Sequence, residues 1–206
     1  MTAKRKDEPL KVLFVASEVA PLAKTGGLAD VANSLPKALI SMGHDVRLAM
    51  PCYATLDKKW LGNRLGTFMV YLGGTHIAGA VRLSSLPGSN APIYLIEQGL
   101  YFARSGLYQA DGQPYSDNLE RFAFFSLGAL EGVAQTGWVP DVVHCNDWHT
   151  ALVPALLKVS QRVNPTWRGL PTVFTIHNLT YQGRFPGGQF YHTGLPEHLF
   201  APDYLE

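Results

Sequence analysis

Two short segments bring imidazole, carboxylate and amide side chains together in the sequence. Residues 144–149 read His-Cys-Asn-Asp-Trp-His, and residues 175–183 begin Thr-Ile-His-Asn. Each segment follows a short apolar run that predicts a strand, and open α/β sheets bind ligands beyond the carboxyl ends of their strands. We therefore expect Asp147, His177 and Asn178 to lie at one ligand site and to hydrogen-bond the hydroxyl groups of a sugar.

Structural roles compete with this interpretation at the same positions. A single histidine is more often a hydrogen-bonded structural residue, but the parallel position of Asp147 favours a functional role for His177. Trp148 can be a stacking platform for a ligand or a filler of the core. A thiolate, a carboxylate and imidazoles at adjacent positions have no common zinc spacing, so we expect no metal here.

A glycine pair, Gly26-Gly27, stands between a predicted strand and a predicted helix. Exposed N–H groups and the positive end of a helix can hold a phosphate there, and Lys24 would add a positive charge. An ordinary glycine turn explains the pair equally well. A nicotinamide dinucleotide site is disfavoured, because the spacing G-x-G-x-x-G is absent and residues 49–52, which end the next predicted strand, include no acid for a ribose.

The first fifty residues predict the beginning of a parallel sheet. The run 10–19 is short, apolar and rich in valine and predicts a buried strand, and the run 45–51 predicts a second strand. Between them, apolar residues at three- and four-residue steps predict a helix over 28–42, which Gly43 ends. Pro36 should bend this helix or leave a carbonyl unpaired. Strand, glycine loop, helix and strand in this order are typical of a Rossmann-like α/β domain.

The middle of the chain is richer in β-forming residues. Three such runs, joined at glycine-containing turns, cover 68–72, 77–86 and 93–96. They predict a hairpin that extends the sheet. A loop rich in glycine and tyrosine is expected over 101–115.

The alternation of helices and strands then returns. Asp117 and Glu120 resemble a helix-start box, with the side chains of both residues bonded to the helix's first N–H groups. Short buried strands are expected at 142–144 and 173–176, and the apolar spacing between them predicts a helix over 151–159.

The composition excludes several classes of partner. Seventeen basic and sixteen acidic residues leave a formal charge of +1, so we expect no nucleic acid partner. Cys52 and Cys145 predict neither a disulfide framework nor a zinc knuckle, which favours a reduced, cytoplasmic compartment. The N-terminal apolar run is unlike a signal sequence, and no segment is long enough to span a membrane. We expect a flexible tail over 1–9 and a single domain over 10–206.

Four stretches of sequence carry a resemblance to a known family. They are KVLFVASEVAPLAKTGGLADVANSLPKAL, the region of YFARSGLY and YSDNLERFAFF, DVVHCNDWHTALVPALL, and TVFTIHNLTYQGRFP. KTGGLAD followed at these distances by NDWHT and HNLTYQG is far more specific than a glycine motif alone. From about Leu10 to its end, the sequence resembles the glycogen and starch synthase family.

The resemblance implies the N-terminal half of a glycosyltransferase-B architecture, in which two Rossmann-like domains face each other across a cleft. It implies transfer of glucose from ADP-glucose to the non-reducing end of an α-1,4-glucan with retention, without a metal or another cofactor. The first domain mainly holds the acceptor. On the donor side, the resemblance puts Lys24, Gly26 and Gly27 against the donor phosphates and Asp30 near the transferred sugar or the acceptor.

On the acceptor side, the resemblance makes His177 the main catalytic candidate, which would bond the transferred glucose and stabilise developing positive charge. Asp147 and Asn178 would orient sugar hydroxyls, and Tyr108 would contact the acceptor. One departure from the family pattern lies in this loop, where Ala103 occupies a place that is often acidic.

The sequence stops at Glu206, before the second domain that the resemblance implies. That C-terminal domain should supply the adenine pocket, most donor-phosphate contacts and a carboxylate for the transferred glucose, so we expect the chain alone to be inactive. Two alternatives stay open: a non-catalytic α-glucan-binding module, and a related transferase that uses another nucleotide sugar such as UDP-glucose. The residues do not distinguish glycogen from starch, and a plant or algal source would make a plastid the compartment.

Overall fold

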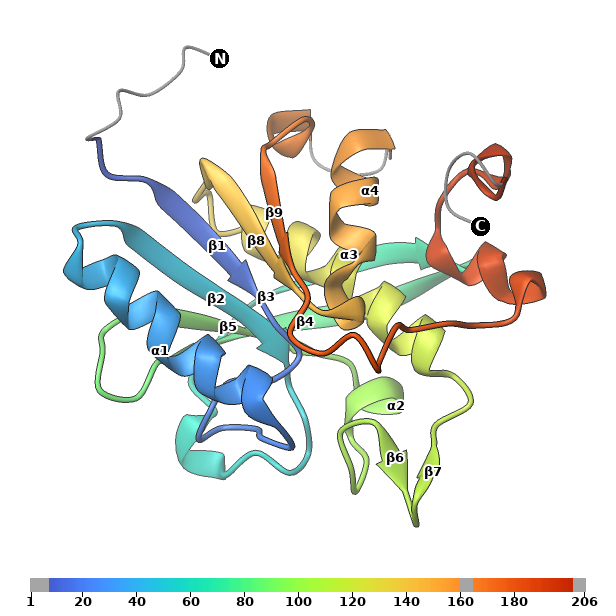
Figure 1. Ribbon diagram of the computed structural model, residues 1–206, viewed down its shortest axis with the longest axis horizontal. Coiled ribbons are helices and arrows are strands. Elements are labelled where there is room, and N and C mark those ends of the chain that lie inside the picture. Colours follow the sequence, from blue (N-terminus) through green and yellow to red (C-terminus); the bar gives the residue numbers. More distant parts are fainter. Residues whose placement is uncertain (1–7, 160–164, 202–206) are drawn as a thin grey trace.

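The computed structural model describes residues 8–159 and 165–201 of the 206-residue chain. Most of the segment expected to be a tail, residues 1–7, lies outside the described residues. The described part forms a mostly parallel seven-stranded sheet with helices packed on it (Figure 1). The predicted α/β class is therefore confirmed.

The strands lie in the order β3-β4-β5-β2-β1-β8-β9. The neighbours from β5 to β9 in this order are parallel, whereas β4 is antiparallel to both β3 and β5. Their bounds are Lys11–Val15 for β1, Asp45–Pro51 for β2, Arg64–Leu72 for β3, Thr75–Ser85 for β4, Pro92–Glu97 for β5, Val142–Asn146 for β8 and Thr172–Thr175 for β9. The predicted hairpin thus extends one edge of a parallel sheet.

Four α-helices accompany the sheet in the described residues. They are α1 (Gly27–Ser41), α2 (Gly99–Phe102), α3 (Asn118–Ala134) and α4 (Leu152–Val159). α1 continues through Pro36 without a break, and Gly43 follows it with φ +95°, a conformation that favours glycine at the end of a helix. In the described residues, each helix is too short or too polar to cross a membrane.

Glycines let α3 lie close to the sheet. A Cβ added at Gly128 would lie 2.8 Å from Ile96 and 2.9 Å from Phe68, and one at Gly132 would lie 3.1 Å from Phe68. Every residue of α3 from Arg121 to Leu130 is buried. This helix therefore forms the centre of the core over β3, β4 and β5, and its close packing requires the two glycines.

Two predictions for the segment before α3 are wrong in detail. The expected loop over 101–115 contains the end of α2 and a small ladder of β6 (Gln109–Ala110) and β7 (Gln113–Pro114). The helix-start box does not form, because the Asp117 side chain makes no cap hydrogen bond and instead accepts from the Arg104 guanidinium at 2.8 Å. An ion pair with a nearby arginine replaces the local cap.

The prediction that residues 173–176 form a buried strand is wrong about burial. β9 is present, but all of its residues except Thr175 are exposed, and Val173 has 48% of its surface open to solvent. β9 is the last strand in the sheet order and pairs on one side only, with β8. The apolar run therefore predicted the strand correctly. Its burial depends on whether another strand or helix covers it, which the apolar pattern does not show.

Candidate functional site

The glycine loop connects the carboxyl end of β1 to α1. Gly26 is the cap residue that precedes the helix, and it has extended backbone with φ −149° and no side-chain cap. Lys24 Nζ lies 2.6 Å from Asp30 Oδ1 and 2.7 Å from Oδ2, and both side chains are about half exposed to solvent. A cation thus stands beside the positive end of a helix, and the pair with Asp30 holds it there.

A buried carboxylate fixes this loop from behind. Glu18 is 3% exposed, and its Oε1 accepts a hydrogen bond from Thr25 Oγ1 at 2.6 Å. Its Oε2 accepts from the backbone N–H groups of Thr25 and, at 3.3 Å, of Gly26. The glycine loop is therefore held by charge-assisted bonds from a residue that lies eight positions earlier than Gly26.

Tyr108 is directed toward the same carboxylate. Its hydroxyl donates to Glu18 Oε1 at 2.6 Å and lies 2.8 Å from Ser17 Oγ. Burial, together with Tyr53 and the negative charge of Glu18, raises the pKa of Tyr108 well above its usual range, so the hydroxyl keeps its proton. The structure thus places Tyr108 behind the glycine loop, with its hydroxyl used inside the protein.

The second cluster lies at the adjoining strand end. Asn146, the last residue of β8, is fully buried and donates from Nδ2 to the carbonyl of Val15, the last residue of β1, at 3.0 Å. Its Oδ1 lies 2.9 Å from His177 Nε2. The carboxylate of Asp147 accepts from the backbone N–H of His177 at 2.7 Å. One bond from the last residue of β8 and one from the residue after it therefore hold His177 in position.

These bonds define the state of the His177 ring. Because Asn146 donates through Nδ2 to two carbonyls, its oxygen must accept, so His177 Nε2 carries a proton, and in the neutral ring Nδ1 carries the lone pair. Asp147 has φ +57°, an uncommon conformation for a residue other than glycine that turns the chain sharply at the end of β8. Asn146 was missed in the sequence: it lies within the motif at 144–149, but its inward position was not evident.

Two neighbouring residues complete this edge. Asn178 is exposed, and its Oδ1 accepts from the N–H of Thr180 at 2.9 Å in a local turn. His144 Nε2 lies 2.8 Å from Thr175 Oγ1 across β8 and β9. Burial and the nearby His177 lower the pKa of His144, which favours a neutral ring behind the site. The structure thus brings Asp147, His177 and Asn178 to one edge, as predicted.

Aromatic rings pack behind the second cluster. His149 is buried and stacks on Trp148, with ring centroids 3.9 Å apart, and it contacts the Tyr108 ring in a tilted arrangement at 4.6 Å. Trp148 is half-buried and also contacts Phe122 and Phe185. Nδ1 of His149 is buried without a hydrogen-bond partner. Packing with its neighbours therefore accounts for Trp148, one of the two roles that the sequence left open.

His149 should make the fold sensitive to acid. Burial and the positive charge of Arg121 lower the pKa of His149 to about 3, below the value of about 6.5 expected in the unfolded chain. As pH falls, the unfolded chain takes up a proton first, so stability is lost from about pH 6.5 down to about pH 3. The free energy of unfolding of both chains should fall when the pH is lowered from 7 to 5. We expect this fall to be about 2 kcal/mol smaller in His149→Phe than in the wild-type chain. Urea unfolding at the two pH values measures this, and equal losses would contradict it.

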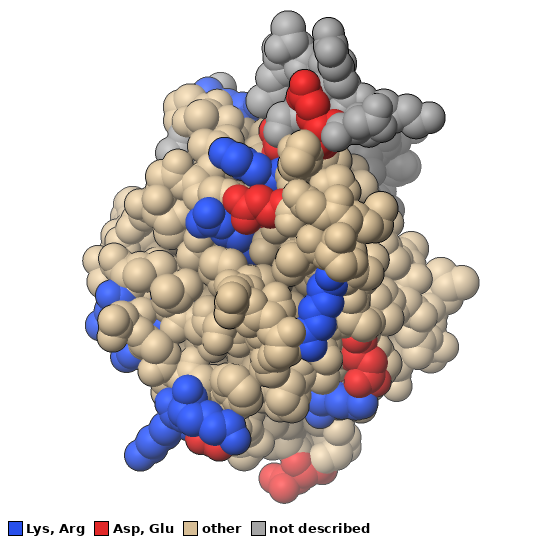
Figure 2. Space-filling model, turned by 90° about the vertical axis from the view of Figure 1, so that its left-hand side faces the viewer, with Lys and Arg blue, Asp and Glu red and all other residues tan. Residues whose placement is uncertain are grey.

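Metal-ligating side chains are dispersed in the structure. Within residues 8–159 and 165–201, no group of three His, Cys, Asp or Glu side chains is placed to hold a metal ion. Cys145 is buried in β8, and burial raises the pKa of its thiol to about 12. On the face shown in Figure 2, basic and acidic side chains are scattered and intermixed.

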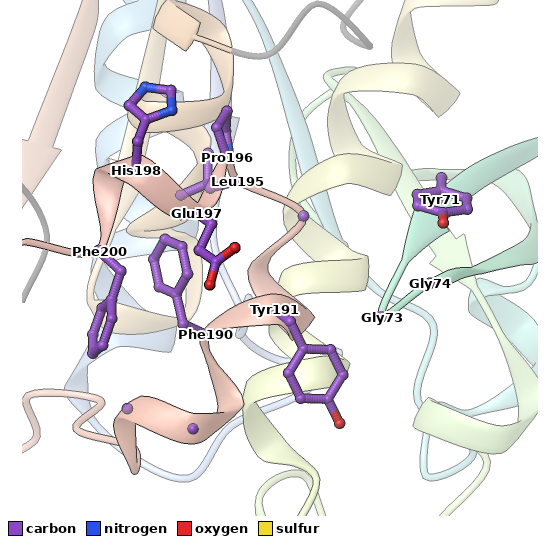
Figure 3. A pocket seen from close by; sticks show the side chains of 13 residues that line it. Tyr71, Gly73, Gly74, Phe190, Tyr191, Leu195, Pro196, Glu197, His198 and Phe200 are labelled. Carbon is purple, nitrogen blue, oxygen red and sulfur yellow. The ribbon is translucent and has the colours of Figure 1, made fainter.

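A large cavity of the described residues is lined by none of the residues of the two polar clusters. It has a volume of about 960 Å³ and opens between the β3–β4 turn and the segment 187–200 (Figure 3). Tyr71 projects from the strand side, and Phe190, Tyr191 and Phe200 project from the other. This cavity is therefore separate from the two polar clusters at the strand ends.

Comparison with known proteins supports the resemblance. Residues 11–206 match the family model described as the starch synthase catalytic domain. The chain is 44% identical over 201 residues to the glycogen synthase of Moorella thermoacetica, covering 97% of this chain and 40% of that protein. It is 45% identical over 199 residues to glycogen synthase 2 of Geobacter sulfurreducens, covering 96% of this chain and 41% of that protein.

A solved structure shows the same fold. The catalytic domain of starch synthase IV from Arabidopsis thaliana, bound to ADP and acarbose, superposes with a TM-score of 0.83 at 31% identity. The match covers 96% of this chain and 40% of that one, so the chain spans about two-fifths of the length of the proteins it matches. The chain belongs to the family of starch synthase catalytic domains.

Proposed function

We propose that the described edge of the sheet is one side of a glucosyl-transfer site, with ADP-glucose as the donor and an α-1,4-glucan as the acceptor, and with retention at the transferred carbon. The glycine loop faces the donor phosphates, and the cluster on β8 and after β9 faces the transferred glucose and the acceptor. A C-terminal domain of the whole protein supplies the remaining donor contacts. The name of the Arabidopsis complex supports the two ligand classes, a nucleotide and an oligosaccharide analogue.

The observation that carries the donor side is the open space over the glycine pair. A Cβ added at Gly26 or Gly27 would meet nothing within 4 Å. Gly26 has extended backbone that any residue adopts, and Gly27 is the first residue of α1. Because no side chain or neighbouring atom covers these positions, a ligand can approach the backbone closely there. The positive helix end and Lys24 make that ligand an anion.

The observations on the acceptor side are the fixed orientations of hydroxyl-binding groups. His177 presents an imidazole whose Nε2 is bonded to Asn146, so Nδ1 can accept a bond from a sugar hydroxyl. Asp147 is already bonded to the His177 backbone through Oδ1, which leaves Oδ2 to bind a hydroxyl. Asp30 becomes free to bind the sugar when donor phosphates attract Lys24 away from it.

The proposed activity can be tested in a chimeric synthase. Residues 11–206 would replace the matching part of the Moorella thermoacetica glycogen synthase, and glucose transfer from ADP-glucose to maltoheptaose would be measured. Transfer supports the proposal. A chimera that folds and binds maltoheptaose but transfers no glucose would favour the binding-module alternative, and preference for UDP-glucose would assign another donor.

The glycine pair gives a sharper prediction. In the chimera, we expect Gly27→Ala to raise the KM for ADP-glucose about tenfold, which corresponds to about 1.4 kcal/mol, because the methyl group would occupy the space of the donor phosphates. The free energy of unfolding should stay unchanged or rise by up to about 1 kcal/mol, because alanine favours the helix. Steady-state kinetics and urea unfolding measure the two quantities.

The matched control for Gly27→Ala is Gly99→Ala. Gly99 is also the first residue of a helix, and a Cβ there also meets nothing within 4 Å. This variant should leave the KM for ADP-glucose unchanged. An unchanged KM in Gly27→Ala as well would show that the donor does not approach the loop.

A further inference from the structure

We propose that Glu18 is a positioning residue that, through the Tyr108 hydroxyl, couples the order of the glycine loop to the segment 101–117. The proposal rests on the proposed function in one respect, because the value of an ordered glycine loop to the protein depends on its role in donor binding. The coupling itself is a property of the chain and can be measured without any substrate.

The carboxylate of Glu18 is surrounded by donors from two distant parts of the sequence. Thr25 and Gly26 donate to it from the loop, and Tyr108 donates from 90 residues away. A buried carboxylate costs free energy unless hydrogen bonds satisfy its oxygens. Glu18 therefore links the loop to Tyr108. Removing one donor lets the carboxylate move, which weakens its hydrogen bonds to the other donors.

The Tyr108 end of this link is itself fixed. Arg121, which is fully buried in α3, donates to the carbonyls of Tyr101 at 2.7 Å and Leu107 at 2.9 Å. Asn118 Nδ2 donates to the carbonyl of Tyr108 at 3.0 Å. The segment before α3 is therefore tied to the helix at Tyr101, at Leu107 and at Tyr108 itself, and a shift of this segment moves the Tyr108 hydroxyl relative to Glu18.

The arrangement also selects which N–H groups remain for a ligand. The N–H groups of Thr25 and Gly26 point inward to Glu18. The next N–H groups, those of Gly27 and Leu28, belong to the first turn of α1, where backbone donors lack a partner within the helix. Glu18 thus divides the loop into an anchored half and a half that stays available to an anion.

The test uses the isotope-labelled 206-residue chain and the amide signals of Thr25 and Gly26. Glu18→Gln should move both amide proton shifts upfield, because a carboxylate acceptor is replaced by a neutral amide. Tyr108→Phe, which removes one oxygen atom, should speed Thr25 amide exchange about tenfold. In the Glu18→Gln background, the same Tyr108→Phe change should have less than half of that effect, which identifies Glu18 as the link.

Tyr94→Phe is the matched control for the hydroxyl. Tyr94 is buried on β5, and its hydroxyl accepts from Arg47 at 2.8 Å, away from the loop. If Tyr108→Phe disturbs the Thr25 and Gly26 amides no more than Tyr94→Phe does, the coupling is refuted. Should Glu18→Gln fail to fold, the comparison of these two tyrosine variants still decides.

Kinetics of the chimera separate the coupling from the proposed function. If the loop binds the donor, Tyr108→Phe should raise the KM for ADP-glucose about fivefold or more and leave the dissociation constant for maltoheptaose within about twofold. Disturbed amides with an unchanged KM for ADP-glucose would support the coupling and overturn the donor role of the loop. Undisturbed amides would overturn the coupling whatever the kinetics.

Discussion

Replacing His177 by alanine in the chimeric synthase is expected to lower kcat about a hundredfold or more while changing the affinity for maltoheptaose less than about threefold. The ring is held by Asn146 at Nε2, and the backbone N–H of His177 is held by Asp147. These two bonds fix the direction of the Nδ1 lone pair. We expect the ring to stabilise the transition state more than the bound substrate, because positive charge develops on the transferred glucose only in the transition state. Initial rates and glucan binding by calorimetry measure the two quantities.

The controls for His177→Ala distinguish chemistry from folding. His76→Ala, at an exposed histidine on β4, should leave kcat unchanged. Asn146→Ser should retain the ring but loosen its orientation, with a loss of kcat smaller than that of His177→Ala. Equal losses of kcat and of glucan affinity in His177→Ala would refute a role in the transition state and indicate ordinary acceptor binding.

The order of elements in the first βαβ unit could be predicted from the sequence, although β1 ends at Val15 and is shorter than the strand expected over 10–19. The boundaries of β2 and α1 agree with the predicted runs to within one residue, because periodicity of 2 or 3.6 and the glycine after the helix are local signals. The placement of Asp147 and His177 at one edge could also be predicted. Both residues follow strands that are parallel, so the carboxyl ends of these strands lie together.

The partners within the site could not be predicted, because they join residues far apart in the chain. Glu18 and Tyr108 are 90 positions apart, and Asn146 and His177 are 31 apart. Each pair includes a residue that has no unusual local context, such as a glutamate that follows a strand. Whether a side chain binds a ligand or holds another residue in place depends on the direction in which it points. In a loop, the sequence has no periodicity from which this direction could be predicted.

Local rules also failed where a tertiary partner competed with them. Asp117 has the type and spacing of a helix cap, yet the guanidinium of Arg104 binds it more strongly than the neutral N–H groups of α3 would. Glu120, the other half of the expected box, lies 2.8 Å from His192 instead. A guanidinium and an imidazole brought in by the fold therefore replaced a cap that is favoured in an isolated helix.

Arg121→Met is expected to lower the free energy of unfolding by about 3 kcal/mol. Arg121 is fully buried, and burial lowers its pKa, so the buried charge costs folding free energy that methionine would not cost. This gain is smaller than the cost of the lost hydrogen bonds. The guanidinium donates to the carbonyls of Tyr101 and Leu107 and to Asn118 Oδ1 at 2.6 Å, and methionine leaves these three acceptors without a donor. Urea unfolding measures the change.

The contrasting variant is Arg82→Met on β4. Arg82 is partly exposed and forms an ion pair with Glu97 at 3.0 Å, so its loss should cost less than about 1 kcal/mol. If Arg121→Met cost no more than Arg82→Met, the carbonyls before α3 would have to find other donors, and Arg121 would not organise the segment. If the cost is large, the same variant should also disturb the Thr25 amide, because Tyr108 reaches the glycine loop only from the position that Arg121 maintains.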